Sequence, residues 1–258
     1  MSVLWQDRVL NINEGAQSRL GFPAQQHKIV CVVNDYVIFD KVVKTNEKLS
    51  NFDIIDYDNT TENIAITKRY NNFIDEIVGQ RQDDFWMLFI HQDFGITDDI
   101  ESIVEKLNKN CIWGAIGIKI YRGIFIGKKG IEQKIGLKQH RILTLGSISQ
   151  GNNDFNFAPY GKEISSTAEV DSIDCCCIMI HSSLIKKYNL HFDENLTFHM
   201  YAEELCYRTK KEYKIKTKVV QLKCFHLGKG NLNEEYQNSV AYLKNKFKIK
   251  KIPSTCPN

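Results

Sequence analysis

The amino-acid sequence predicts an α/β fold: a doubly wound, mostly parallel sheet with helices on both faces. Short apolar runs without polar alternation, typical of strands buried on both faces, recur along the chain. Stretches with apolar residues at helical spacing separate these runs, as in a parallel sheet with crossover helices. With 258 residues, 43% of them hydrophobic, the chain is long enough to bury one large core.

The chain divides into three parts by composition. Residues 1–27 are expected to be an N-terminal appendage, 28–232 the α/β domain, and 233–258 a C-terminal helix with a basic tail. The first part lacks a basic region followed by an apolar stretch, so it is not a signal peptide. No apolar stretch approaches the roughly 20 residues of a membrane span. We therefore expect a soluble, cytoplasmic protein without a transmembrane segment, and peripheral contact of the basic tail with the inner membrane face stays open.

The first elements are two strands and a helix. Lys28–Val33 is an apolar, β-branched run, and Phe52–Tyr57 is a second short strand. Thr60 or Thr61 can cap the helix that follows. Its buried face would consist of Ile66, Tyr70, Phe73, Ile74 and Ile77.

The next strand is the run from Phe85 to Ile90, which ends abruptly in His91-Gln92-Asp93. A carboxylate at the end of such a strand lies in the crevice where open α/β sheets bind ligands. There it can hold a divalent metal on a phosphorylated substrate. The alternative is that Asp93 merely begins a loop, a common place for Asp.

A helix capped by Thr97 and an apolar strand over Cys111–Ile118 are expected next. The region 121–169 is rich in Gly, Lys, Gln and Asn and has weak periodicity, which predicts a variable middle insert of long loops. The strand pattern returns over Val170–Ile180.

The final elements are a helix over Glu203–Lys211, a strand within Ile215–Phe225 and a helix that begins near Asn233. Glu203 and Glu204 stand near a helix start, where the helix dipole alone would explain two acids. His226 follows an apolar strand and could equally be a buried histidine with satisfied hydrogen bonds.

Charge and cysteine usage exclude two classes of protein. The net charge of +3 is too small for a nucleic-acid-binding surface. None of the 8 cysteines forms a Cys-x-x-Cys pair, so zinc-site spacing is absent, and we expect a reducing compartment.

Four stretches occur in the order found in one enzyme family: IVCVVNDYVIF, WMLFIHQDFGI, VDSIDCCCIMI and FDENLTFHMYAEELCYRTKKEYKIKTKVVQLKCFHLGKG. From about Lys28 to Gly230 the chain resembles the GT-A glycosyltransferases, in the family-2-like group that includes the streptomycin-biosynthesis type. The resemblance implies a GT-A-like fold and transfer of a sugar, with inversion, from a nucleotide-sugar donor. The acceptor would be a carbohydrate or a lipid-linked molecule, as in polysaccharide or glycoconjugate biosynthesis, and the cofactor Mn²⁺ or Mg²⁺.

The resemblance also implies roles for individual residues. Asp93 and His226 resemble the metal ligands, with His91 in place of the first acid of an Asp-x-Asp-type motif. The catalytic base would be Glu204 or Glu203. The remaining implied residues are Asp174 on the acceptor side, where Cys175 replaces a family Gly, and Asn34, Asp35, Tyr57, Asp58, Asn71, His91 and Lys229 on the donor side.

Two other functions stay open at this point. A nucleotidyltransferase usually carries a Gly-rich or basic loop after the first strand, and Asn34-Asp35-Tyr36 argues against it. A non-catalytic nucleotide-sugar or carbohydrate-binding protein is compatible with the replacement of the first motif acid by His91.

Overall fold

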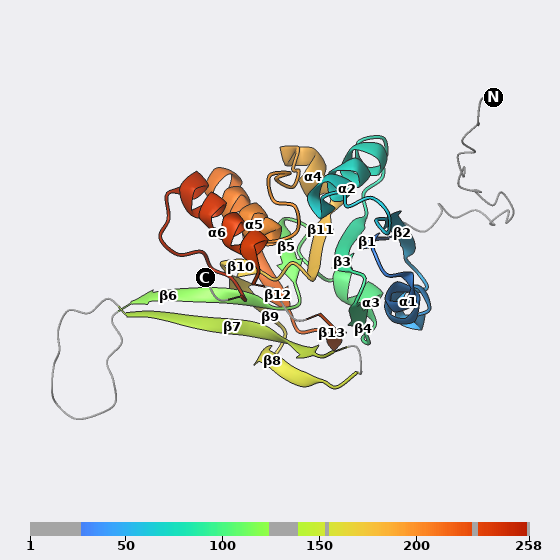
Figure 1. Cartoon of the computed structure of the whole chain (residues 1–258), viewed down its shortest axis with the longest axis horizontal. Coiled ribbons are helices and arrows are strands. Elements are labelled where there is room, and N and C mark those ends of the chain that lie inside the picture. The colour runs from blue at the N-terminus through green and yellow to red at the C-terminus, as the bar shows by residue number, and fades with distance from the viewer. Residues whose placement is uncertain (1–26, 124–138, 153–154, 229–231, 257–258) are drawn as a thin grey trace, which may run out of the picture.

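The computed structural model describes residues 27–123, 139–152, 155–228 and 232–256 (Figure 1). These residues form a mixed α/β fold with two sheets instead of one doubly wound sheet. Figure 1 shows helices α2, α4, α5 and α6 on one side of the molecule and strands β6, β7 and β8 on the other. No helix among the described residues is long and apolar enough to cross a membrane.

The first sheet has the order β2-β1-β3-β11-β5-β12-β9 within the described residues. Its strands are β1 (Lys28–Val33), β2 (Asp53–Asp58), β3 (Trp86–His91), β5 (Cys111–Gly114), β9 (Thr167–Val170), β11 (Cys177–His181) and β12 (Lys216–Val220). β1 pairs in parallel with β2 and β3, and β5 with β12. The sheet is nevertheless mixed, because β11 runs antiparallel between β3 and β5, and β9 runs antiparallel to β12.

The second sheet has the order β10-β6-β7-β13-β4, with β8 paired to β7. Its strands are β4 (Phe94–Ile96), β6 (Gly117–Gly123), β7 (Gln139–Gln150), β8 (Ala158–Lys162), β10 (Ser172–Ile173) and β13 (Cys224–His226). The predicted loops of 121–169 are therefore wrong where this region is described. β7 escaped detection because a bulge at Leu145 and Gly146 breaks the alternation that identifies a strand.

Three apolar stretches that we predicted to be single strands each contain parts of two strands, one in each sheet. Cys111–Ile118 contains the start of β6 as well as β5, Val170–Ile180 contains β10 and most of β11, and Ile215–Phe225 contains β12 and most of β13. β3 and β4 divide between the sheets in the same way. The chain thus passes between the sheets at several neighbouring points, and polar residues at these crossings are brought together.

The helices differ from expectation mainly at their starts. They are α1 (Tyr36–Phe39), α2 (Ile66–Phe73), α3 (Ile100–Val104), α4 (Ser182–Tyr188), α5 (Tyr201–Tyr213) and α6 (Glu234–Phe247). α2 begins after the predicted caps, because Thr60 donates to Asp58 in a turn. Asp99 caps α3 instead of Thr97, whose hydroxyl donates to the Lys223 carbonyl. α6 begins where predicted, and Asn233 caps it by accepting from the Tyr236 N–H.

The core consists of two apolar clusters on opposite faces of the first sheet. Val30 and Phe89 pack on one face with α2, α4, α5 and α6. Ile29 and Leu88 pack on the other with α3 and strands of the second sheet. β1 and β3 are therefore buried on both faces, as their continuous apolar runs predicted.

Candidate metal centre

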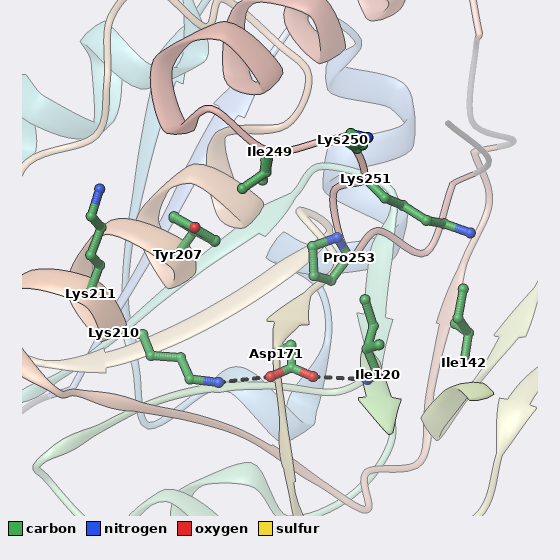
Figure 2. Close-up of a pocket in the computed structure, with 10 residues that line it drawn as sticks. All are labelled: Ile120, Ile142, Asp171, Tyr207, Lys210, Lys211, Ile249, Lys250, Lys251 and Pro253. Atoms are coloured by element: carbon green, nitrogen blue, oxygen red, sulfur yellow. Dashed lines mark hydrogen bonds and ion pairs between the residues drawn. The ribbon is translucent and has the colours of Figure 1, made fainter. Parts of the chain in front are cut away.

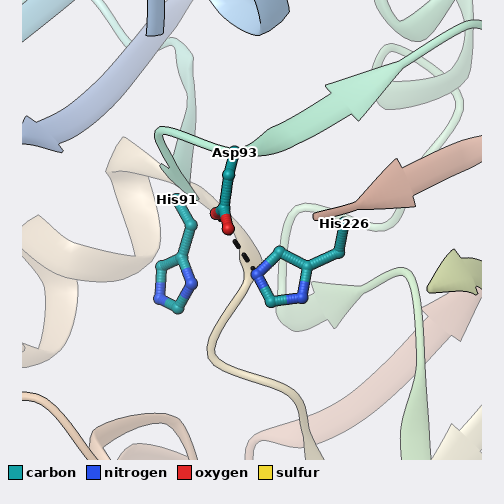
Figure 3. Close-up of side chains that lie close together, drawn as sticks. All are labelled: His91, Asp93 and His226. Carbon is teal, nitrogen blue, oxygen red and sulfur yellow. Dashed lines mark ion pairs between the residues drawn. The ribbon is translucent and has the colours of Figure 1, made fainter. Parts of the chain in front are cut away.

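Three side chains converge where the two sheets meet. His91 ends β3, Asp93 precedes β4, and His226 ends β13 (Figure 3). Each offers a ligand atom, and these atoms lie within 4.8 Å of one another. His226 Nε2 is 3.3 Å from Asp93 Oδ1. Two imidazoles and a carboxylate at this separation are a donor set that can hold a divalent transition metal.

Strand pairing explains why residues far apart in sequence meet here. β13 is antiparallel to β4, in a register that places His226 opposite Phe94. The Leu227 N–H donates to the Asp93 carbonyl at 3.1 Å. Because Gln92 and Asp93 form the turn that joins β3 to β4, the same pairing also sets His91 beside His226.

The protonation states of the three side chains are coupled, and His226 must release its proton to bind a metal. Burial raises the pKa of Asp93, but the hydrogen bond from His226 and its charge outweigh burial and hold this pKa at about 2. Burial lowers the pKa of His226, and the Asp93 carboxylate reverses this, so the net pKa is raised. Burial and the neighbouring His226 lower the pKa of His91 to about 4. His91 is therefore neutral at pH 7, the form that binds metals.

Tyr201, the first residue of α5, fixes the orientation of His91. Its hydroxyl is 2.9 Å from His91 Nε2 and donates to the Cys175 carbonyl at 3.1 Å. Since a hydroxyl has one hydrogen, His91 Nε2–H must be the donor to Tyr201, and Nδ1 carries the lone pair. Phe198 stacks on the same imidazole, with ring centroids 5.8 Å apart. Such support of the second ring nitrogen is common around metal-binding histidines.

Asp174 lies beside the candidate metal centre, between β10 and β11. Its carboxylate accepts a hydrogen bond from the Cys176 N–H at 2.9 Å and another from the Thr255 hydroxyl. Burial raises the pKa of Asp174, but these bonds and the charge of His226 outweigh burial, so the net pKa is lowered. Asp174 is therefore ionised, and its charge acts on both His91 and His226.

Glu203 is a buried carboxyl group in the first turn of α5. It accepts a hydrogen bond from Ser254 Oγ at 2.6 Å, and Cys175 Sγ is 3.6 Å away. Burial raises the pKa of Glu203 to about 7 despite the bond from Ser254, and the charge of Asp174 acts in the same direction. Glu203 and Asp174 thus form one electrostatically coupled acidic group.

Glu204 has different partners. Its carboxylate is fully buried and accepts from Arg208 Nε at 2.8 Å and Lys246 Nζ at 2.7 Å. Lys246 also donates to Asp193 at 2.6 Å. These contacts join α5 to α6 and to the chain before α5. The Glu204 carboxylate therefore has a structural role, because its ion pairs hold the two helices together.

Four residues predicted on the donor side lie at the same edge of the first sheet as His91. Val32 of β1 is opposite both His91 and Tyr57, so these three residues form one row across the sheet. Asn34 and Asp35 follow β1, and Asp58 ends β2. The carboxyl ends of these parallel strands therefore meet at one edge.

Hydrogen bonds occupy several of these polar groups. Gln92 Nε2 donates to Asn34 Oδ1 at 2.5 Å, and its Oε1 accepts from the backbone N–H groups of Asn34 and Asp35. The Asp35 carboxylate caps α1 by accepting from the backbone of Val37 and Ile38. The turn after β1 is thus tied directly to the turn that carries Asp93.

Asn71, in contrast, is committed to a structural contact. Its amide donates to the Phe192 carbonyl at 3.0 Å and to Glu194 at 2.9 Å, and it accepts from the Phe192 N–H at 2.8 Å. Every hydrogen bond of the side chain therefore goes to the loop before α5. Lys229, the other predicted donor-side residue, lies outside the described residues.

The structure adds residues that sequence reasoning missed. Gln150, at the end of β7, lies with Nε2 3.4 Å from His226 Nδ1 and donates to the Gly228 carbonyl. Ser254 and Thr255, in a segment after α6, donate to the carboxylates of Glu203 and Asp174 respectively. Gln150 fell within the predicted loops, and nothing in the local sequence around Ser254 marks it as a neighbour of Glu203.

Comparison with known proteins finds distant similarity among solved structures. No family model matches the chain, and no curated protein matches it. Among solved structures, the crystal structure of HddC from Yersinia pseudotuberculosis is similar at 13% sequence identity and a TM-score of 0.33. The match covers 86% of this chain and 79% of that chain. Similarity at this level establishes neither a family nor an activity for the chain.

Proposed function

We propose that this protein transfers a sugar from a nucleotide-sugar donor to an acceptor hydroxyl, with a divalent metal at His91, Asp93 and His226. The observation that supports this most is the convergence of these three side chains at the carboxyl edge of the first sheet. Asp174 is electrostatically coupled to His226 of these three, and Glu203 is coupled to Asp174.

The donor atoms favour Mn²⁺ over Mg²⁺. Mg²⁺ prefers oxygen ligands in near-ideal octahedral geometry, whereas imidazole nitrogens suit later first-row metals. Three protein ligands leave coordination positions for diphosphate oxygens and water. When bound, the metal would neutralise the charge that develops on the diphosphate as the bond to the sugar breaks.

Glu203 is the residue that we propose as catalytic base. A general base works best when its pKa lies near the working pH, and the pKa of Glu203 is about 7. Ser254 Oγ already donates to its carboxylate at 2.6 Å, which is the contact that an acceptor hydroxyl needs. Glu204 is less suited to this role because two cations hold its carboxylate between α5 and α6. A single base with no covalent intermediate would invert the sugar carbon.

The donor nucleotide would lie against the ends of β1 and β2. Asn34, Asp35, Tyr57 and Asp58 offer amide, carboxylate and aromatic groups there for the base and ribose. The turn from Asn34 to Phe39 has no lysine or arginine for a triphosphate. This favours a nucleotide-sugar donor over the substrate of a nucleotidyltransferase.

Binding and turnover test the proposal separately. Thermal unfolding is measured with nucleoside diphosphates and nucleotide-sugars, each with Mn²⁺, Mg²⁺, Zn²⁺, Fe²⁺ or chelator. A ligand present at 100 times its dissociation constant stabilises the folded state by about 2.7 kcal/mol, which is readily seen as a higher midpoint. We expect a nucleotide-sugar with Mn²⁺ to produce this shift, and release of nucleoside diphosphate to follow when the acceptor is present.

Two variants assign the roles. Asp93→Asn should abolish the metal-dependent shift, and Glu203→Gln should retain the shift but lose turnover. Glu105→Gln, which changes an exposed carboxylate, is the matched control. Donor binding with no transfer or hydrolysis over hours would favour a binding protein. A shift with Fe²⁺ alone would instead indicate the His-Asp-His chemistry of iron(II) oxygenases, and metal binding unchanged in Asp93→Asn would contradict the site itself.

A further inference from the structure

A cavity of about 810 Å³ lies between α5, the segment after α6, and strands β6 and β7 (Figure 2). None of its lining residues belongs to the metal centre or to the acidic group of Asp174 and Glu203. Its volume falls within the range of about 300–1,000 Å³ in which proteins bind small molecules. The cavity is therefore large enough for a ligand of its own.

Apolar side chains form the middle of the cavity. Tyr207 of α5, Ile249, Pro253 and Ile120 of β6 line it and are labelled in Figure 2. Ile142 of β7 completes this surface and is 40% exposed, which is unusual for an isoleucine. Burying these groups against an apolar chain would remove hydrophobic surface from water.

Lysines flank the apolar surface from two sides. Lys210 and Lys211 extend from α5 on one side, and Lys250 and Lys251 lie on the other (Figure 2). Asp171, the acid that lines the cavity, accepts hydrogen bonds from Lys210 at 2.7 Å and from the backbone of β6. The positive charge of Lys210 is thus balanced within the protein.

Lys211, Lys250 and Lys251 have no ion pair with any described residue. Their charges stand at the rim of a concave, partly apolar surface, where low-dielectric walls strengthen the field that attracts anions. A neutral ligand would leave these charges without partners, and a small inorganic anion would leave the apolar surface wet.

We propose that this cavity binds an amphipathic organic anion, a phosphate monoester on a short aliphatic chain. The phosphate would contact Lys250 and Lys251 at one rim, and the chain would cover Tyr207, Ile249 and Ile142. This site is separate from the proposed transfer reaction, so either proposal can fail without the other.

Calorimetry with octyl phosphate, kept below its micelle concentration, tests this proposal. Inorganic phosphate and octyl glucoside test the charged and apolar parts alone, and we expect each to bind at least tenfold more weakly. The affinity for octyl phosphate should fall as NaCl rises from 0.05 to 0.5 M, because salt screens the exposed lysines. Equal binding of inorganic phosphate or of octyl glucoside would overturn the proposal, as would no binding of octyl phosphate.

Variants locate the binding. Two variants alter exposed side chains of the cavity: the double variant Lys250→Glu/Lys251→Glu and the single variant Ile142→Asp. Each should lower the affinity for octyl phosphate at least tenfold. Lys106→Glu/Lys109→Glu makes the same charge change on exposed residues near α3 and should leave affinity within twofold. An equal loss in this control would contradict the site. Binding to phosphatidylglycerol vesicles without binding of monomeric octyl phosphate would identify a membrane-surface contact instead and overturn the cavity site.

Discussion

Glu203 and Glu204 are consecutive residues of α5, yet their carboxylates lie in different surroundings. Successive residues of a helix point about 100° apart, so one acid faces Ser254 and Cys175 while the other faces Arg208 and Lys246. Glu203 has no cationic partner among the described residues, and burial raises its pKa to about 7. The neighbouring side chains, more than the residue type, thus make Glu203 a candidate base and Glu204 a member of a structural ion pair.

Glu203→Gln should change how stability depends on pH. The pKa of Glu203 is raised from 4.5 to about 7 on folding, so the native state holds this proton more tightly than the unfolded chain. Its ionisation therefore destabilises the fold progressively as pH rises from about 4.5 to about 7, by about 3 kcal/mol in total. Urea denaturation between pH 4.5 and 8 should show this loss in the native protein and not in Glu203→Gln. Parallel pH curves for the two proteins would contradict the raised pKa.

Tyr201→Phe should weaken metal binding without removing a ligand. The Tyr201 hydroxyl accepts a hydrogen bond from His91 Nε2–H. Removing this hydroxyl leaves the imidazole free to change tautomer. Loss of such a supporting contact typically costs 10–100-fold in metal affinity. Titration calorimetry with Mn²⁺ measures the effect, and Tyr36→Phe, which removes an exposed hydroxyl bonded to Asp56, is the control. Unchanged Mn²⁺ affinity in Tyr201→Phe would exclude a positioning role.

Helices α5 and α6 depend on charged contacts as well as apolar ones. Lys246 of α6 forms ion pairs with both Glu204 and Asp193, and the ring centroids of Tyr207 and Phe247 lie 4.3 Å apart. The α5 helix also carries Tyr201 and Glu203, so its position sets part of the proposed site. The contacts between the two helices therefore help to hold Tyr201 and Glu203 in position.

Glu204→Gln should destabilise the protein by about 3 kcal/mol, because it leaves Arg208 and Lys246 without the buried carboxylate that they share. Urea denaturation at pH 7 measures this loss. Glu212→Gln changes an exposed acid of the same helix and should have little effect. A Glu204→Gln variant that is as stable as the native protein, but inactive, would instead assign Glu204 to catalysis.

Continuous apolar runs identified where strands lie but not which sheet they join. β1 and the start of α6 match the predicted Lys28–Val33 and Asn233, because an apolar run and a capping residue are local signals. The crossing between β5 and β6 leaves no such signal, since Ala115 and Ile116 at the crossing are buried too. The parallel edge around His91 could thus be predicted, whereas the second sheet that supplies the end of β7 could not.

Across the whole molecule, the candidate site lies where the chain passes between the two sheets. β3 belongs to the first sheet, β4 and β13 to the second, and the three metal-ligand candidates lie at their ends. A ligand shared by His91, Asp93 and His226 would therefore join both sheets. Metal binding should consequently stabilise the contact between the sheets more than either sheet alone.

Hydrogen exchange can measure this coupling. With saturating Mn²⁺, backbone amides of β4 and β13 should exchange more slowly, because opening their antiparallel pair would break the metal site. Amides of α2, which lies across the first sheet, should change less. The Asp93→Asn variant should show no Mn²⁺ effect in either region. Uniform slowing across the chain would indicate general stabilisation and contradict a specific link between the sheets.

The segment Ile252–Cys256 has a kinetic consequence. Ser254 and Thr255 each donate a hydroxyl to an acid of the proposed site, the Tyr160 hydroxyl donates to the Thr255 carbonyl, and Ile252 is buried. An incoming alcohol that needs those carboxylate oxygens competes with two hydroxyls already in place. Each catalytic cycle would then include release and return of this stretch, and the rate of that exchange would set an upper limit on turnover.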